Sequence, residues 1–298
     1  MNIPFSKFSG AGNDFIMIDN RDLRITCNGI KVAGYEVQPK SLDLQMFISK
    51  VCRRGLSVGA DGVILIEKSD IADFKMRYFN ADGSEADTCG NGARCTARFA
   101  YLKGIVLRKM RFETRTGIYD AEITEQGTVK VKMNNPSQPK LNLKVPTKLG
   151  ILNVHFINTG VPHLVVFISD MQELVGKDIT LVNLDIFNLG RELRYHPEFQ
   201  PTGTNVNFVE VVEQHKFNIR TYERGVENET LACGTGSIAG AIIAYRLGKM
   251  ISPVAAHTQG GSLLKIYFDA TPNSIINVYL EGDARFVYEG ILFDEAII

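Results

Sequence analysis

Two short segments of the chain place a cysteine between a glutamate and a pair of glycines. Glu85 stands four residues before Cys89, and Glu229 stands four residues before Cys233. Each cysteine is followed by Gly-x-Gly and then by residues of helical character. The first turn of a helix leaves N–H groups without internal partners and carries the positive end of the helix dipole. Because a thiolate is stabilised there, each segment predicts a reactive thiol with a lowered pKa.

The N–H groups beside each thiol can also hold a carboxylate, and the glycines let a ligand approach the backbone closely. An amino acid held between two such units would turn its Cα–H toward one thiol and the opposite face of Cα toward the other. One thiolate removes the proton and the opposite thiol returns one, so the configuration inverts. Amide donors aimed at the developing carbanion charge would stabilise it. This pair of segments therefore indicates stereoinversion of an amino acid without a cofactor.

The similarity between the halves extends beyond the cysteines. At a separation similar to that of the two cysteines, residues 9–19 loosely resemble residues 159–170, and residues 58–67 loosely resemble residues 202–211. Three matches in the same order predict two copies of one α/β unit, which can pack about a pseudo-twofold axis.

Composition and length limit the class of protein. The chain has 298 residues, enough for about two domains, and equal numbers of basic and acidic residues, 33 each. Nothing in it has the basic footprint of a nucleic-acid binder. The N-terminus does not read as a signal peptide, and the uncharged stretch 231–245 is too short to span a bilayer. Five cysteines, an odd number, favour reduced thiols over a disulfide framework. We therefore expect a cytoplasmic protein that binds neither nucleic acid nor membrane.

Local patterns predict the elements that carry these segments. Apolar or alternating runs predict strands at 15–19, 62–67, 74–79, 109–114, 128–133, 152–160, 163–168, 204–212, 216–223, 263–268 and 274–282. Helical spacing and glycine turns predict helices at 41–54, 90–104 and 235–248, and the Pro- and Asn-rich segment 134–140 is a candidate linker.

Other sites are less well supported. Cys27, Cys52 and Cys95 lack the flanking pattern and are assigned to packing or chance. No metal site is expected, because Cys89 and Cys95 lack the usual ligand spacing and have no histidine nearby. The glycines after Cys233 follow a polar segment instead of a buried strand, which disfavours a dinucleotide loop. A hydrolase pairing one cysteine with His163 stays a minor alternative.

Together these segments resemble one family, the diaminopimelate epimerases, which are pyridoxal-phosphate-independent amino-acid racemases built from two similar α/β domains. The resemblance covers nearly the whole chain, in order. It is carried by "FSGAGNDF" (8–15), "RRGLSVGADG" (53–62), "FNADGSEADTCGNGARC" (79–95), "TGVPH" (159–163), "GTNVNFV" (203–209), "YERGVENETLACGTGS" (222–237) and "QGG" (259–261).

The resemblance implies a role for each matching residue. Cys89 and Cys233 would form the acid–base pair, Glu223 would accept a substrate ammonium, and Arg224 would bind the distal carboxylate. The remaining substrate-binding residues fall into two sets. The α-carboxylate cradle consists of the amides of Gly90, Asn91, Gly234 and Thr235, and the side-chain amide ligands are Asn13, Asn80 and Asn205.

The resemblance also implies the fold. We expect an α/β (α+β) protein of two pseudo-symmetric domains, 1–133 with 283–298 and 134–282, with the last strand returning to the first domain. Each would be a curved, mostly antiparallel sheet around a central helix, with the active site in the cleft between the domains.

The implied activity is conversion of LL- to meso-diaminopimelate in lysine and peptidoglycan precursor synthesis, with no cofactor and a small amino acid as the partner. A homodimer is left open. Gly62 and Val161 stand where many members carry Gln and Asn, and the turn at 225–230 has one extra residue. Because of these departures, the alternative that the protein is a related racemase of another amino acid, such as histidine, stays open. A non-catalytic ligand-binding or thiol-redox protein is the alternative from a different class.

Overall fold

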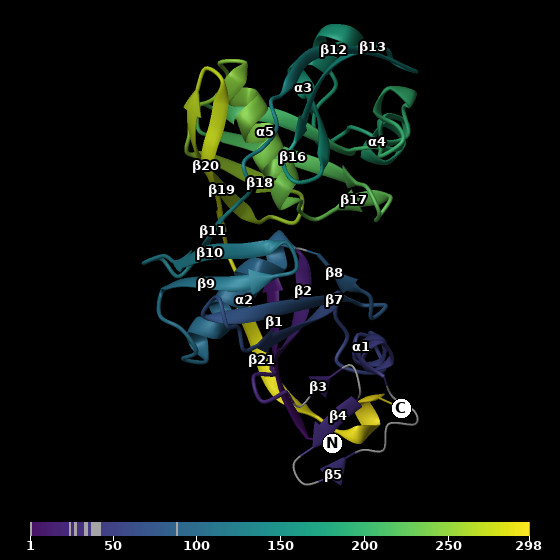
Figure 1. The fold of residues 1–298 in the computed structure, drawn as a ribbon. Coiled ribbons are helices and arrows are strands. Elements are labelled where there is room, and N and C mark those ends of the chain that lie inside the picture. The colour runs from purple at the N-terminus through teal and green to yellow at the C-terminus, as the bar shows by residue number, and fades with distance from the viewer. Residues whose placement is uncertain are drawn as a thin grey trace. The chain divides into compact units, whose positions relative to one another are not determined.

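The computed structural model describes residues 2–23, 25–26, 29–32, 35–36, 43–87 and 89–297, with only the backbone of residues 26–36 among them. The chain divides into two compact units, Met1–Val131 with Asp283–Ile298, and Lys132–Gly282. Figure 1 shows both, the first coloured purple to blue with a yellow C-terminal segment, and the second teal to yellow-green. Cys27 and the start of the helix expected over 41–54 lie outside the described residues.

The elements of the first unit are β1 (Ile3–Gly10), β2 (Asn13–Asp19), β3 (Ile25–Thr26), β4 (Gly29–Val32), β5 (Tyr35–Glu36), α1 (Leu44–Val51), β6 (Gly62–Glu67), β7 (Phe74–Asn80), β8 (Glu85–Ala86), α2 (Gly90–Leu102), β9 (Lys109–Thr114), β10 (Gly117–Ile123), β11 (Val129–Lys132), β21 (Arg285–Leu292) and the 3₁₀ helix η2 (Asp294–Ile297).

The elements of the second unit are β12 (Lys140–Thr147), β13 (Gly150–Asn158), β14 (Pro162–Phe167), α3 (Ile168–Val175), α4 (Ile186–Arg194), the 3₁₀ helix η1 (Pro197–Phe199), β15 (Asn205–Glu213), β16 (Lys216–Glu223), β17 (Asn228–Thr230), α5 (Gly234–Arg246), β18 (Val254–Thr258), β19 (Leu263–Thr271) and β20 (Ser274–Gly282).

The two main sheets have the same strand order and the same directions. In the first unit the order is β21-β1-β2-β6-β7-β9-β10-β11, and β2–β6 and β7–β9 are the parallel pairs. In the second it is β12-β13-β14-β15-β16-β18-β19-β20, and β14–β15 and β16–β18 are the parallel pairs. All other neighbours run antiparallel, as expected from the sequence. β21, from the C-terminal end, takes the edge position in the first unit that β12 takes in the second.

A single helix lies at the centre of each sheet. α2 packs against β1, β2, β6 and β10. β1 and β10 lie toward opposite edges of the sheet, so the sheet must curve around the helix for both to contact it. α5 likewise packs against β13, β14, β15, β16, β18 and β19. The sequence of α5, GTGSIAGAIIAYR, is apolar on nearly every face, and such a helix needs cover all round. The expected curved sheet around a central helix is confirmed in both units.

The central strands are buried on both faces, which explains their unbroken apolar sequences. Every residue of β6 is buried, and Val63 and Leu65 belong to the core beneath α1. Ile64 points the other way, toward Gly92 of α2, as alternation along a strand requires. In the second unit α3 and α4 supply the outer layer over β14 and β15. Strands paired in parallel and covered on both faces typically have such continuous apolar runs.

The sequence located some strands at their observed residues and missed others, in the interior of the sheets as well as at their edges. β6, β9, β16 and β20 occupy the expected residues, while α1 is shorter than expected. The sequence analysis missed β1, β10, β12, β18, β21, α3 and α4. Several of these are edge strands or short outer helices with one exposed face, and their mixed polar and apolar residues give a weak periodic signal.

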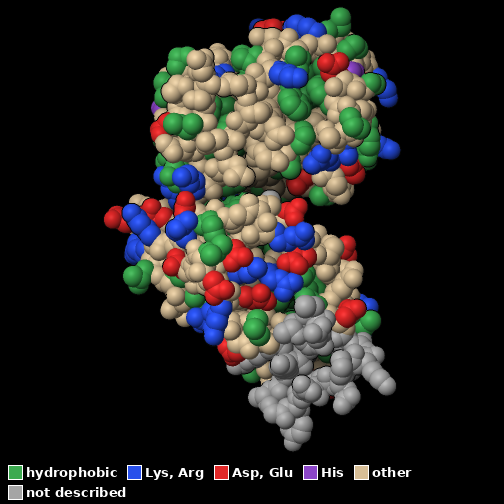
Figure 2. Space-filling model, viewed as in Figure 1, with side chains coloured by type: hydrophobic (Ala, Val, Ile, Leu, Met, Phe, Trp, Pro, Cys, Tyr) green, Lys and Arg blue, Asp and Glu red, His purple; other side chains and the backbone are tan. Residues whose placement is uncertain are grey.

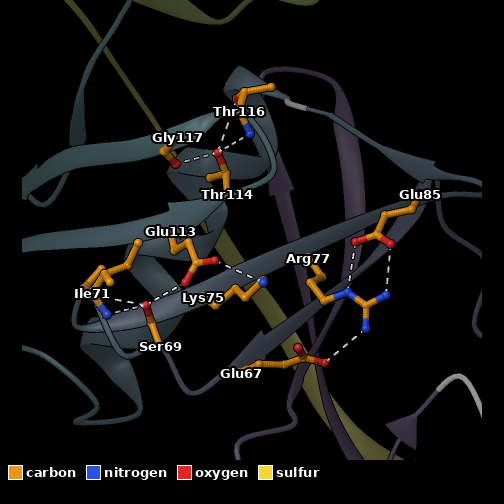
Figure 3. A network of polar contacts seen from close by, with 11 residues as sticks. Glu67, Ser69, Ile71, Lys75, Arg77, Glu85, Glu113, Thr114, Thr116 and Gly117 are labelled. Carbon is orange, nitrogen blue, oxygen red and sulfur yellow. Dashed lines mark hydrogen bonds and ion pairs between the residues drawn. The ribbon is translucent and has the colours of Figure 1, made fainter.

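The surface of the first unit carries acidic and basic side chains side by side (Figure 2). Two ion pairs of this unit, Lys75–Glu113 at 3.1 Å and Arg77–Glu85 at 2.9 Å, are labelled in Figure 3. Within the described part of the chain, no helix has the length and apolar character needed to cross a membrane.

Candidate active site

Cys89 is the N-cap residue of α2. Its backbone is extended (φ −151°, ψ 113°), and its Sγ accepts a hydrogen bond of 3.3 Å from the main-chain N–H of Gly92. The thiol is half-buried, and Gly90 and Asn91 follow it as the first two residues of the helix. The sulfur therefore lies against the unpaired N–H groups of a helix start, the position expected from the sequence.

Cys233 is the N-cap residue of α5, and its side chain is buried, with 8% exposed. Its Sγ lies 3.5 Å from Oγ1 of Thr235. Burial, and secondly the carboxylate of Glu223, raise the pKa of this thiol to about 12, while Thr235 and the N–H of Gly236 lower it. The lowered pKa expected for this thiol is thus wrong, because desolvation outweighs the helix end.

The glutamate of each cysteine motif is held by an arginine from the strand before it. Arg77 donates from Nε and Nη2 to the two carboxylate oxygens of Glu85, each at 2.9 Å (Figure 3). Arg220 does the same to Glu229, at 2.6 and 2.7 Å. These two forks join β7 to β8 and β16 to β17, the short strands that lead to the cysteines. Neither arginine was identified from the sequence, although both stand eight or nine residues before their glutamate.

Asn13, at the start of β2, is bound to the first turn of α2. Its Oδ1 accepts a 2.8 Å hydrogen bond from Nδ2 of Asn91, and its Nδ2 donates to Asp61 at 3.0 Å. The approach of α2 to β1 depends on Gly10, because a Cβ there would lie 3.0 Å from Sγ of Cys95 and 3.3 Å from the carbonyl of Asn91.

Asn80, the last residue of β7, pairs with Gly62 in the sheet and donates from Nδ2 to Ser84 Oγ at 3.1 Å. Gly62 cannot carry a side chain in this backbone, because a Cβ would lie 2.3 Å from the carbonyl oxygen of Phe79 and 2.6 Å from the ring of Tyr78. Tyr78 thus occupies the space beside Gly62. Burial chiefly, and next the charge of Cys89, raise the pKa of Tyr78.

In the second unit Asn205 and Arg224 are in direct contact. Oδ1 of Asn205 accepts a 2.8 Å hydrogen bond from the main-chain N–H of Arg224, whose guanidinium donates to the carbonyl of Thr202 at 3.0 Å. Glu223, beside it, accepts a 3.0 Å hydrogen bond from Thr230, and burial raises its pKa.

His163 lies on β14 with none of its surface exposed, and its Nδ1 lies 3.1 Å from Nδ2 of Asn207. Burial, and secondly Arg224, lower the pKa of the imidazole to about 3. Asn207, which the sequence analysis missed, also donates to the carbonyl of Leu164 at 2.8 Å. His163 is therefore held neutral by burial, which does not favour the imidazolium–thiolate pair of a cysteine hydrolase.

Each unit thus brings together one set of the expected residues. Half-site 1 contains Cys89, Gly90, Asn91 and Asn13, with Asn80 at the end of β7. Half-site 2 contains Cys233, Gly234, Thr235, Asn205, Glu223 and Arg224. Within the residues that the structure describes, no three His, Cys, Asp or Glu side chains come together in the manner of a metal site.

Solved structures with the same fold include a phenazine biosynthesis protein of the PhzF family from Bacillus anthracis. It is 16% identical, with a TM-score of 0.66, over 98% of this chain and 99% of that one. A probable proline racemase from Agrobacterium radiobacter K84 is 16% identical, with a TM-score of 0.67, over 98% and 93%. At these identities the likeness concerns the fold.

Curated relatives are much closer in sequence. A diaminopimelate epimerase of Hydrogenobaculum sp. is 45% identical over 96% of this chain and 97% of its own length. One of Aquifex aeolicus is 43% identical over 99% of both, and one of Chlorobaculum tepidum 40% over 95% and 99%. The family model described as diaminopimelate epimerase matches residues 5–138 and 155–287, once in each repeated unit. The chain belongs to the diaminopimelate epimerase family.

Proposed function

We propose that this protein interconverts LL-2,6-diaminopimelate and meso-2,6-diaminopimelate by inverting one α-carbon, in lysine and peptidoglycan precursor synthesis. The observation that carries the proposal is the pair of equivalent cysteines, Cys89 and Cys233, each the N-cap of the central helix of its unit. The substrate comes from the name that the close relatives share. We further propose that residues 1–133 with 283–298, and 134–282, are the two epimerase domains.

The two thiols act as an acid–base pair. One thiolate removes the α-proton, the other thiol gives a proton to the opposite face of the carbon, and the roles exchange in the reverse direction. This mechanism requires both half-sites to act on one substrate molecule, and it uses no cofactor. General acid–base steps of this kind contribute about 10²–10⁴-fold each, so loss of either thiol should remove most of the activity.

The α-carboxylate is bound by the starts of the two central helices. The main-chain N–H groups of Gly90, Asn91, Gly234 and Thr235 belong to first turns, where such groups have no partner within the helix. They are donors already aimed at an anion, and they can also stabilise negative charge that spreads from the α-carbon into the carboxylate. Asn13 and Asn80 add side-chain amides in half-site 1.

The distal end of the substrate is recognised in half-site 2. Arg224 offers a guanidinium whose hydrogen bond in the described structure goes to a neutral carbonyl, so it can pair with a carboxylate. Glu223 offers a carboxylate for an ammonium group, and Asn205 holds the backbone of Arg224 in place. A substrate with a second carboxylate and a second ammonium group matches both Arg224 and Glu223.

The experiment uses the purified, reduced protein with LL-diaminopimelate in ²H₂O, and follows both exchange at Cα and the stereoisomers formed. Cys89→Ser and Cys233→Ser should each lose epimerisation by about 10³-fold or more, as removal of an essential acid or base predicts. Cys95→Ala, on the same helix as Cys89 and fully buried, is the control and should stay active.

Each alternative has its own outcome. Full epimerisation by either serine variant would contradict the two-thiol mechanism. Wild-type protein that binds diaminopimelate without exchanging its α-proton would be a binding or thiol-redox protein. Faster turnover of histidine or another monocarboxylic amino acid would show that Gly62, Val161 and the turn at 225–230 have changed the substrate.

A further inference from the structure

Arg94 is a fully buried cation one turn after Cys89 on α2, with 0% of its side chain exposed. Its hydrogen bonds go to neutral oxygens: Oδ1 of Asn91 at 2.7 Å, and the carbonyls of Gly90 and Asp283, both at 3.4 Å. None of the ion pairs found among the described residues includes Arg94. A buried guanidinium whose hydrogen bonds go to neutral oxygens is costly, and the electrostatic attraction of Asp283 offsets only part of the effect of burial, so packing alone does not explain this residue.

The hydrogen bond from Arg94 begins a chain that passes through half-site 1. Arg94 Nη2 donates to Oδ1 of Asn91, and Asn91 Nδ2 donates to Oδ1 of Asn13 at 2.8 Å. Asn13 Nδ2 then donates to Oδ2 of Asp61 at 3.0 Å. Asp61 is itself paired with Arg54, at 2.8 Å. The chain therefore runs from a cation to an anion through two neutral amides, with every donor pointing in the same direction.

The charged ends fix the orientation of both amides. If Asn91 were flipped, its NH₂ group would face the guanidinium, donor against donor. If Asn13 were flipped, its oxygen would face the carboxylate of Asp61, acceptor against acceptor. The mismatch at Asn91 would leave a buried polar group unsatisfied, and the mismatch at Asn13 would set an oxygen against a part-buried carboxylate. The charged groups at the two ends of the chain thus determine the orientation of both amides.

This orientation decides what half-site 1 can bind. Oδ1 of Asn13 already accepts from Asn91 and one N–H already donates to Asp61, so the donor that Asn13 still offers is the second N–H of Nδ2. The neighbouring groups at the start of α2 are main-chain N–H donors as well. Half-site 1 accordingly presents donors, and the ligand group that matches them is a carboxylate.

Half-site 2 has no equivalent of this cation at the matching position. The residue five positions after Cys233, as Arg94 is after Cys89, is the buried Ile238. The buried amide beside α5, Asn207, is held by neutral groups, Leu164 O and the hydroxyl of Thr221 among them. The two half-sites therefore differ in the groups that orient their buried amides: a cation in half-site 1 and neutral groups in half-site 2.

We propose that Arg94 is a positioning residue that fixes the amides of Asn91 and Asn13 so that the second N–H of Asn13 is turned to the ligand, and so makes half-site 1 selective for the carboxylate of the amino-acid substrate. This role rests on the proposed function above. It adds a residue remote from the reacting atoms that acts through two amides.

The test compares Arg94→Leu with Ile238→Leu, the matched change in the other unit, and with Arg94→Lys. In wild-type protein labelled with ¹⁵N, the side-chain NH₂ signals of Asn13 and Asn91 should be protected from exchange with solvent. Arg94→Leu should lose this protection and raise the KM for LL-diaminopimelate about tenfold or more, the loss expected for one unsatisfied or misaligned contact. Arg94→Lys keeps the charge and one donor, and should restore part of both effects. Ile238→Leu should change neither.

Unchanged NH₂ signals and an unchanged KM in Arg94→Leu would overturn the proposal. So would a fall in the melting temperature with both readouts as in wild type, because that is the behaviour of a purely structural residue. Since the NH₂ signals need no turnover, failure of the proposed reaction would be recognised separately, from the cysteine variants.

If Arg94→Leu does not fold, Asn91→Asp gives the second test. The new carboxylate still accepts from Arg94, and can form an ion pair with it, but it can no longer donate to Asn13. The folded variant should show altered Asn13 signals and a raised KM. Wild-type values for both would overturn the proposal.

Discussion

Arg220 holds Glu229 through two parallel hydrogen bonds, from Nε to Oε1 at 2.6 Å and from Nη2 to Oε2 at 2.7 Å. Arg77 and Glu85 form the same fork in the other unit, at 2.9 Å for both bonds. Because each glutamate stands four residues before a cysteine, each fork fixes the short strand that leads to a half-site. The glutamate shared by the two motifs is therefore bound in the same structural contact in both units.

The forks predict a loss of stability when the glutamate is neutralised. Glu85→Gln and Glu229→Gln remove a charge-assisted pair that is about three-quarters or more buried. Each should lower the free energy of unfolding by about 1–3 kcal/mol, measured by urea denaturation. Asp120→Asn breaks the exposed pair with Arg111 and should change it by less than about 1 kcal/mol. Equal effects at all three sites would contradict a special role for the forks.

The thiol of Cys233 should react slowly with iodoacetamide at neutral pH in the absence of substrate. Burial and Glu223 raise its pKa to about 12, so the reactive thiolate is scarce at pH 8 and becomes more abundant toward pH 12. Glu223→Gln removes the negative charge, lowers the pKa and should speed alkylation at pH 8–9. Peptide mapping after timed alkylation measures the rate at Cys233 itself. A rate that is the same in both proteins would show that Glu223 does not influence this thiol.

His163 should make the protein less stable in acid. Its folded pKa of about 3 lies below the ordinary value of 6.5, so the neutral form stabilises the fold fully above pH 6.5, and this contribution is lost as the pH falls toward 3. One proton of difference between the unfolded and folded states gives a slope of about 1.4 kcal/mol per pH unit. Urea denaturation at several pH values should show a shallower slope for His163→Gln. His215→Gln, at an exposed position, is the control, and a slope unchanged by His163→Gln would refute the prediction.

Arg224 should decide between diaminopimelate and shorter relatives. Arg224→Ala should lower kcat/KM for LL-diaminopimelate by about 100-fold, equivalent to a charge-assisted contact of ~3 kcal/mol. Lysine has the same carbon chain and second ammonium group without the distal carboxylate, so the strong preference of the wild type over lysine should shrink by a similar factor. Arg111→Ala, which removes an exposed arginine of the first unit, should leave the ratio as it is. A preserved preference in Arg224→Ala would place the distal carboxylate elsewhere.

The sequence by itself determined the repeat and the place of each thiol. Cys89 and Cys233 stand at the N-caps of α2 and α5, as expected, because a glycine turn followed by a helical segment is a local signal. The buried strands β6 and β16 were also predicted at their observed residues, since an apolar or alternating run is carried by neighbouring residues alone.

Only the tertiary structure decided how these local elements act on one another. The hydrogen-bonded chain from Arg94 through Asn91 and Asn13 to Asp61 joins residues from a helix, a strand and a loop. No residue spacing in the sequence predicts it. The raised pKa of Cys233 follows from burial, which depends on everything packed around α5. In the sequence Gly62 was only a position where many family members carry Gln, yet in the structure the backbone of β7 and the ring of Tyr78 leave no room there for a Cβ. The pKa of a thiol, the orientation of an amide and the room for a side chain all depend on the charges and atoms nearby in space. Many of those neighbours are distant in the sequence, so only the folded structure brings them together.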